Sequence, residues 1–132
     1  MAVQLVWFKR DLRISDHAPL YEAAQRGPVI CLYIDEPLIQ KSDEFSPRDR
    51  RFLDECLLEL DEKLRDLGAG LLRVAGDACE VLKSLHHQHL FEAVWSHEET
   101  GNTATYKRDQ TLARWFKEQG ITWNELPQHG IF

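Results

Sequence analysis

The chain has 132 residues, of which 43% are hydrophobic and 29% charged, so it is long enough for one packed domain and too short for two. Its 22 acidic residues outnumber the 16 basic ones and give a formal charge of −6. Domains that bind nucleic-acid phosphates usually carry a net positive charge, which argues against a DNA-binding surface here. No stretch is apolar enough to cross a bilayer and no basic leader precedes the first apolar segment, so we expect a soluble cytoplasmic protein.

The three cysteines give no sign of a covalent or metal framework. Cys31, Cys56 and Cys79 are odd in number and far apart in the sequence. This spacing favours neither a disulfide scaffold nor a Cys-x-x-Cys metal site. A reducing compartment agrees with that pattern.

Five short apolar segments alternate with four helical ones. The predicted strands are residues 4–8, 29–34, 71–75, 93–96 and 121–123. Asp16 and Pro19 predict the start of the first helix. Ser46 and Pro47 begin the second helix and Gly68 ends it. Its apolar stripe consists of leucines spaced three and four residues apart: Leu53, Leu57, Leu60, Leu64 and Leu67.

The last two helices carry weaker signals. The third is predicted to begin at Asp77, and the fourth to begin near Asn102 or Thr103 and to end before Gly120. In the fourth helix, residues 107–109 are interpreted as a charged outer face, with three inward side chains, Leu112, Ala113 and Phe116. At least three of the four tryptophans are expected in the core: Trp7, Trp95, Trp115 and Trp123.

Regular alternation of strands and helices predicts a parallel sheet covered on both faces, which is a Rossmann-like three-layer αβα sandwich. Right-handed crossovers and short connections favour the strand order 3-2-1-4-5. The order reverses between the first and fourth strands, so loops 9–15 and 97–102 should face each other across a crevice at the carboxyl edge. Asp35 and Glu36 follow the second strand and border this crevice, the default ligand site of the architecture.

The familiar site motifs are absent from the sequence. Without a Gly-x-Gly-x-x-Gly segment or a Walker-type loop, a simple NAD or ATP site is not supported. The segment 86–89 holds three histidines but no second ligand set with metal spacing, so we interpret it as the exposed end of the third helix and expect no metal. His97, Glu98 and Glu99 are either a polar lining for a ligand or a solvated loop. The charged turn 9–13 has the same two interpretations.

Residues 7–13 read Trp-Phe-Lys-Arg-Asp-Leu-Arg, and residues 16–20 read Asp-His-Ala-Pro-Leu. This closely resembles the opening of DNA photolyases and cryptochromes, Trp-Phe-Arg-Arg-Asp-Leu-Arg followed by Asp-Asn-Pro-Ala-Leu. Matches continue in segments 46–47, 51–53, 72–74, 76–77 and 106–109, so the resemblance covers essentially the whole chain. Two departures are Lys9 for arginine and His17 for asparagine. A lysine at position 9 offers a point charge in place of a planar fork.

The resemblance implies an N-terminal α/β domain that holds a light-harvesting chromophore, joined in the parent to a helical domain that binds FAD and the DNA lesion. Residues 1–132 would then be the antenna domain as a fragment, without the FAD-binding domain and without catalytic residues or activity of its own. Ala104 and Thr105 stand where the folate-binding subgroup has Asn-Glu, which argues against folate and leaves open a flavin or deazaflavin pigment or an empty site. The candidate pigment-binding residues are Phe8, Lys9, Arg10, Asp11, Asp35, Glu36, Glu98, Glu99 and Asn102.

For the parent, the resemblance implies light-driven, FAD-dependent repair of pyrimidine dimers in DNA. Two alternatives stay open: a cryptochrome photoreceptor without repair activity, and a free-standing nucleotide-binding α/β module. The expected partners are the parent's own helical domain and, through the parent, damaged DNA, with no membrane. The surface that docks on the helical domain would be exposed in a fragment and could support self-association.

Overall fold

The computed structural model describes residues 2–37, 47–99 and 103–127 of the chain. The strands are β1 (Gln4–Phe8), β2 (Val29–Asp35), β3 (Leu71–Ala75), β4 (Ala93–His97) and β5 (Thr122–Leu126). The helices are α1 (Ala18–Arg26), α3 (Pro47–Asp66), α4 (Ala78–His89) and α5 (Thr103–Gln119). Every predicted element is confirmed, and the largest shift is at β5, which continues to residue 126.

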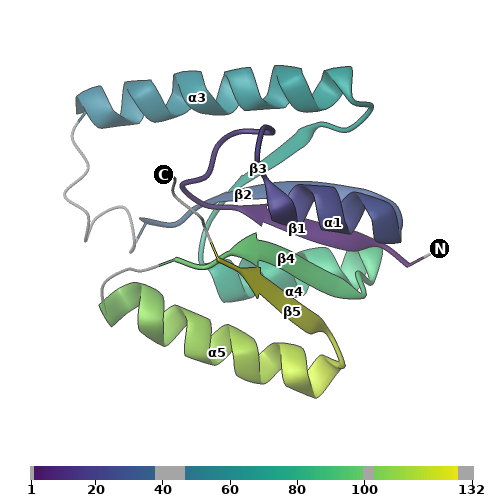
Figure 1. Cartoon of the computed structure of the whole chain (residues 1–132). Coiled ribbons are helices and arrows are strands. Elements are labelled where there is room, and N and C mark those ends of the chain that lie inside the picture. The colour runs from purple at the N-terminus through teal and green to yellow at the C-terminus, as the bar shows by residue number, and fades with distance from the viewer. Residues whose placement is uncertain (1, 38–46, 100–102, 128–132) are drawn as a thin grey trace.

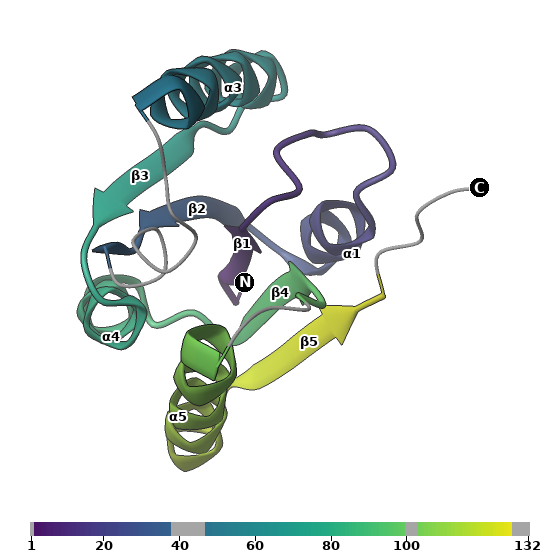
Figure 2. The same cartoon turned by 90° about the vertical axis from the view of Figure 1, so that its left-hand side faces the viewer.

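All five strands are parallel and lie in the order β3-β2-β1-β4-β5, as the sequence predicts. Helices α1 and α3 cover one face of the sheet, and α4 and α5 cover the other (Figures 1 and 2). The molecule is therefore the expected three-layer αβα sandwich. Parallel strands bring all their carboxyl ends to one edge, which is where ligands bind in this architecture.

The central strand β1 separates two hydrophobic cores. Leu5 and Trp7 pack with α4 and α5, whereas Val6 and Phe8 pack with α1 and α3, because successive side chains of a strand point to opposite faces. All five residues of β1 and of β4 are buried, while the edge strands β3 and β5 are partly exposed. The two central strands β1 and β4 are thus the most completely buried, and the loops that follow them start from fixed positions.

Helix α3 follows its predicted leucine stripe over most of its length. Leu57, Leu60 and Leu64 are buried and Leu53 packs against them. The prediction for Leu67 is wrong: this residue follows the last helical residue and is 65% exposed. Gly68 has a φ of +86°, the left-handed conformation that glycine adopts at low cost, and it ends the helix as expected. Ser46 lies outside the described residues.

The first helix begins differently from the prediction. His17, and not Asp16, is the N-cap of α1, since its Nδ1 accepts a hydrogen bond from the backbone N–H of Leu20 at 3.1 Å. Asp16 lies in the turn before it with a φ of 49°. Asp77 caps α4 as predicted, accepting a hydrogen bond from the N–H of Glu80. Because His17 caps helix α1 through one ring nitrogen, the contacts of its other ring nitrogen also position the start of this helix.

Two interpretations of helix surfaces are wrong. Arg108 is buried and not part of an outer face, although Lys107 is exposed, and Ala113 points outward where an inward side chain was expected. Leu112 and Phe116 are buried as predicted. The periodicity of α5 accounts for both errors, because its buried positions are three or four residues apart: Thr105, Arg108, Leu112 and Phe116.

The prediction that the tryptophans contribute to the core is confirmed. Trp7 and Trp95 are buried, and the other two tryptophans pack against the core on the α4 and α5 face. The three cysteines are free. The end of α4 is not wholly exposed, because the ring of His86 packs edge-on against Phe91 and Trp115. None of the described helices is both long and apolar enough to span a bilayer.

Candidate functional site

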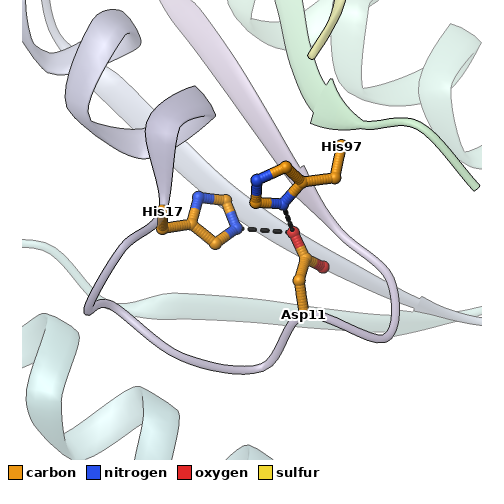
Figure 3. A group of neighbouring side chains, drawn as sticks. All are labelled: Asp11, His17 and His97. Carbon is orange, nitrogen blue, oxygen red and sulfur yellow. Dashed lines mark hydrogen bonds and ion pairs between the residues drawn. The ribbon is translucent and has the colours of Figure 1, made fainter. Parts of the chain in front are cut away.

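The loops that follow β1 and β4 meet at the carboxyl edge of the sheet, where the sequence places the crevice. Two groups of polar side chains gather there. The first, the dihistidine cluster, consists of Asp11, His17 and His97 (Figure 3). The second, the carboxylate–guanidinium cluster, consists of Lys9, Glu36, Glu99 and Arg108.

In the dihistidine cluster one carboxylate accepts three hydrogen bonds. Oδ2 of Asp11 lies 2.6 Å from Nε2 of His17 and 2.7 Å from Nδ1 of His97, and Oδ1 accepts the backbone N–H of Lys9 at 2.8 Å. All three cluster residues are at most 5% exposed. The cluster therefore joins the turn after β1, the first turn of α1 and the end of β4 by buried, charge-assisted bonds.

These contacts fix the positions of the protons. Nδ1 of His17 accepts from Leu20, so its proton is on Nε2, which donates to Asp11. Burial by itself would raise the pKa of Asp11, but the hydrogen bond from His17 and its electrostatic interaction with that ring, together with hydrogen bonds from the Lys9 N–H and His97, hold that pKa well below its usual range. Burial lowers the pKa of His97 despite its bond to Asp11. The carboxylate of Asp11 is therefore ionised, and the imidazole of His97 is neutral at pH 7.

The dihistidine cluster does not fit a metal ion, although its three donor atoms lie within 4.8 Å of one another. A metal needs a nitrogen lone pair, and Nε2 of His17 carries a proton because its other nitrogen accepts from the backbone. The separations of 2.6 and 2.7 Å are hydrogen-bond lengths. Among the described residues, the dihistidine cluster therefore has a structural role: it holds the loop after β1 in place.

The carboxylate–guanidinium cluster lies on the other side of β1, against α5. Arg108 donates from Nη1 to Glu36 at 2.8 Å and from Nη2 to Glu99 at 2.6 Å, and its side chain is only 7% exposed. The two carboxylates are thus held by a single guanidinium. Burial, reinforced by the charge of Glu99, raises the pKa of Glu36 to about 7 even though Arg108 opposes the shift.

Lys9 completes this cluster without being fully satisfied by it. Its ammonium lies over the ring of Trp7, 4.4 Å from the centroid, and 5.5 Å from that of Trp123. Nζ is buried, has no hydrogen-bond partner among the described residues, and is 3.6 Å from Oε1 of Glu99. A buried ammonium with unused donors is a natural place for an oxygen atom of a ligand or a water molecule.

The remaining predicted residues are scattered around these clusters. Phe8 is fully buried in the core, and Asp35 turns away to pair with Arg73 at 2.6 Å. Arg10 has an exposed side chain, 3.8 Å from Glu99. Glu98 is exposed, with its backbone N–H bonded to the carbonyl of residue 126, and Asn102 lies outside the described residues. A role in pigment binding stays a prediction for all nine residues.

Sequence reasoning missed three contributors to the site: His17, His97 as a partner of Asp11, and Arg108. The signal for Arg108 was present, because it shares the spacing of the buried face of α5 with Leu112 and Phe116. His17 directly precedes a helix with proline in its first turn, a position where capping side chains are common. No local pattern links His97 to Asp11, which is 86 positions away.

The sequence and the fold both match known proteins. The family model described as DNA photolyase matches residues 4–132. A deoxyribodipyrimidine photo-lyase of a Synechococcus strain is 32% identical over 127 residues, covering 92% of this chain and 26% of the relative. Cryptochrome DASH of Gloeobacter violaceus is 35% identical over 116 residues, covering 83% of this chain and 23% of the relative.

Among solved structures, the archaeal photolyase from Sulfolobus tokodaii with two FAD molecules superposes with a TM-score of 0.83 at 26% identity. That likeness covers 95% of this chain and 29% of the archaeal one. The chain thus spans about a quarter of the length of the proteins that it matches. Because the family model covers nearly every residue, the chain belongs to the DNA photolyase and cryptochrome family.

Proposed function

We propose that this chain is the N-terminal light-harvesting domain of a photolyase-like flavoprotein in the cytoplasm. The observation that carries the proposal is the match to the family along residues 4–132, combined with a length of about a quarter of its relatives. In the parent, a helical domain would bind FAD and carry out light-driven repair of pyrimidine dimers. That helical domain and, through the parent, damaged DNA are the proposed partners. The 132 residues alone would be inactive.

The carboxyl edge around the carboxylate–guanidinium cluster is the proposed pigment site. Its polar groups fit the rim of a flavin or deazaflavin, which presents carbonyl oxygens and ring nitrogens. Lys9 offers an ammonium with unused donors, and Glu36, with a pKa near 7, can donate or accept a hydrogen bond at neutral pH. The pigment would supply absorption of light and transfer of excitation energy, and the protein would hold it at a fixed distance and orientation.

Pigment binding can be tested directly with the 132-residue chain. We expect FMN, FAD or a deazaflavin to bind with quenching or a shift of its fluorescence, and a reduced folate to bind more weakly. Lys9→Met should weaken binding on the order of tenfold, since a hydrogen bond to a charged group is lost. Lys107→Met changes an exposed lysine of α5 and is the matched control. Failure of every flavin, deazaflavin and reduced folate to bind would refute the antenna role.

The photoreceptor alternative is kept because cryptochromes are among the relatives. The two functions differ in the parent and not in this domain. Illuminating the full-length protein with dimer-containing DNA separates them: restored pyrimidines indicate a photolyase, and unchanged dimers with a photoreduced flavin indicate a cryptochrome.

A further inference from the structure

A groove on the α1 face of the molecule is separate from the proposed pigment site. It has a volume of about 850 Å³, within the range of roughly 300–1,000 Å³ typical of small-molecule sites. Its walls include Ile14, Leu20, Tyr21, Leu67 and Pro127, and His97 is part of its lining. Tyr21 is 66% and Leu67 65% exposed, so the groove is open to solvent along its apolar rim.

The polar group in this lining has a defined hydrogen-bonding role. His97 donates from Nδ1 to Asp11, which leaves Nε2 of the neutral ring as an acceptor. Figure 3 shows this second nitrogen turned away from Asp11. No hydrogen bond to it is formed within the described part of the chain, and it is not a fully enclosed atom. The groove thus combines apolar walls with one oriented acceptor.

The charged residues of the groove do not favour an anionic ligand. Arg13 donates from Nε to the carbonyl of Ser15 and from Nη2 to that of Asp16, which holds its guanidinium against its own loop. Asp16 also lines the groove, so its negative charge offsets the positive charge of Arg13. Asp11, though ionised, is already bonded to both histidines. A neutral ligand is therefore favoured.

We propose that this groove binds a neutral, planar aromatic molecule of two or three rings that carries one N–H or O–H group, which donates to Nε2 of His97. The apolar walls contact the rings and the histidine fixes their orientation. The site lies on the opposite side of β1 from the carboxylate–guanidinium cluster and does not depend on the antenna function.

Indole and 1-methylindole form a matched pair of probes, because only indole has the N–H donor. We expect both to shift the NMR signals of Tyr21 and His97 at millimolar concentration, and indole to bind about three- to tenfold more tightly at pH 8. Protonation of Nε2 removes the acceptor, so this preference should disappear at low pH. The charged and titratable groups around His97 are Asp11, His17, Arg13 and Asp16.

Two substitutions of alanine by tryptophan test whether the probes bind in the groove. Ala24→Trp fills the groove from α1 and should abolish binding of both probes, whereas Ala113→Trp adds the same side chain to the exposed face of α5 and should change nothing. Both positions are exposed, so folding is expected to persist. Equal affinity for the two probes at pH 8, binding that survives Ala24→Trp, or sedimentation showing that a second copy covers the groove would overturn the proposal.

Discussion

The two polar clusters at the carboxyl edge include residues only two positions apart, Lys9 and Asp11. They differ in how completely the hydrogen-bonding groups of their side chains are paired. The dihistidine cluster is neatly paired: one ionised carboxylate accepts from three donors. In the carboxylate–guanidinium cluster one arginine donates to Glu36, Glu99 and the adjacent Asp109, and the ammonium of Lys9 has no hydrogen bond among the described residues. A fully paired buried network rigidifies a fold, whereas an incompletely paired one can still gain from a ligand.

The same difference appears in the two carboxyl groups themselves. The pKa of Asp11 is held well below its usual range, and that of Glu36 is raised to about 7. Both groups are buried, so burial cannot explain the contrast. The number of hydrogen-bond donors per carboxylate explains the difference in pKa. Asp11 accepts from three donors, whereas Glu36 shares Arg108 with Glu99.

The strongest way to break the dihistidine cluster is Asp11→Ala. It leaves two imidazoles and the backbone N–H of Lys9 buried without an acceptor, and we expect the free energy of unfolding to fall by about 4 kcal/mol. Urea denaturation measures this. Asp35→Ala, which removes the same kind of side chain from the end of the next strand, should cost about 1 kcal/mol or less because its partner Arg73 is a third exposed. Equal losses of unfolding free energy in the two variants would refute the structural role of the dihistidine cluster.

The corresponding change in the other cluster is Arg108→Met, which keeps the length of the side chain and removes its charge. Glu36 and Glu99 then lose their shared donor, and we expect a loss of about 3 kcal/mol in the free energy of unfolding. The adjacent Lys107→Met should be within about 0.5 kcal/mol of the parent chain, as exposed substitutions usually are. A small effect at position 108 would mean that water replaces the guanidinium.

The clusters should respond oppositely to pH. The pKa of Glu36 is about 7 in the folded chain against 4.5 ordinarily, so the folded state binds the extra proton and stability falls as pH rises between these values. The lowered pKa values of Asp11 and His97 act in reverse: their contributions are lost as pH falls, below about 4 for Asp11 and below about 6.5 for His97.

The variant Glu36→Gln isolates one side of this contrast. Relative to the parent chain, it should gain on the order of 1–3 kcal/mol between pH 5 and pH 7.5, because the amide cannot ionise. Denaturation curves at the two pH values measure the gain. A difference between the two proteins that does not change with pH would show that Glu36 titrates normally.

The smallest expected effect belongs to Lys9→Met. It removes a favourable contact with the Trp7 ring but also a buried ammonium that lacks a hydrogen bond, so the two terms nearly cancel. We expect the free energy of unfolding to change by less than about 1 kcal/mol. A loss as large as that of Arg108→Met would show that Lys9 is a structural member of the cluster and not a group left available for a ligand.

The fold could be predicted because its signals are local and repeat along the chain. The leucines of α3, the caps of α4 and the buried strands β1 and β4 each follow from spacing or from residue type within one element. The strand order then follows from the handedness of crossovers. Leu67 was misplaced because periodicity continues past the point where Gly68 ends the helix.

The site was harder to predict because its contacts join distant elements. The spacing of the sequence places Lys9, Asp11 and Glu99 on facing loops. It does not tell which side chain each of them pairs with. Arg108 was assigned to the surface because charged residues usually lie there, and only Glu36 and Glu99 on other elements make its burial tolerable. The pairing of Asp11 with His97 depends on the register of β1 and β4, which sequence patterns do not encode.

The central position of β1 affects how the protein is made. Of the five strands of this sheet, β1 leaves the ribosome first, and it pairs with β2 soon afterwards, Gln4 with Val29. The other edge of β1 can pair only after β4 has been synthesised, because there Gln4 pairs with Ala93. Until β4 has been synthesised, a strand of five buried residues keeps one edge unpaired. The nascent chain therefore passes through a period of exposed strand edge in which aggregation or chaperone binding competes with folding.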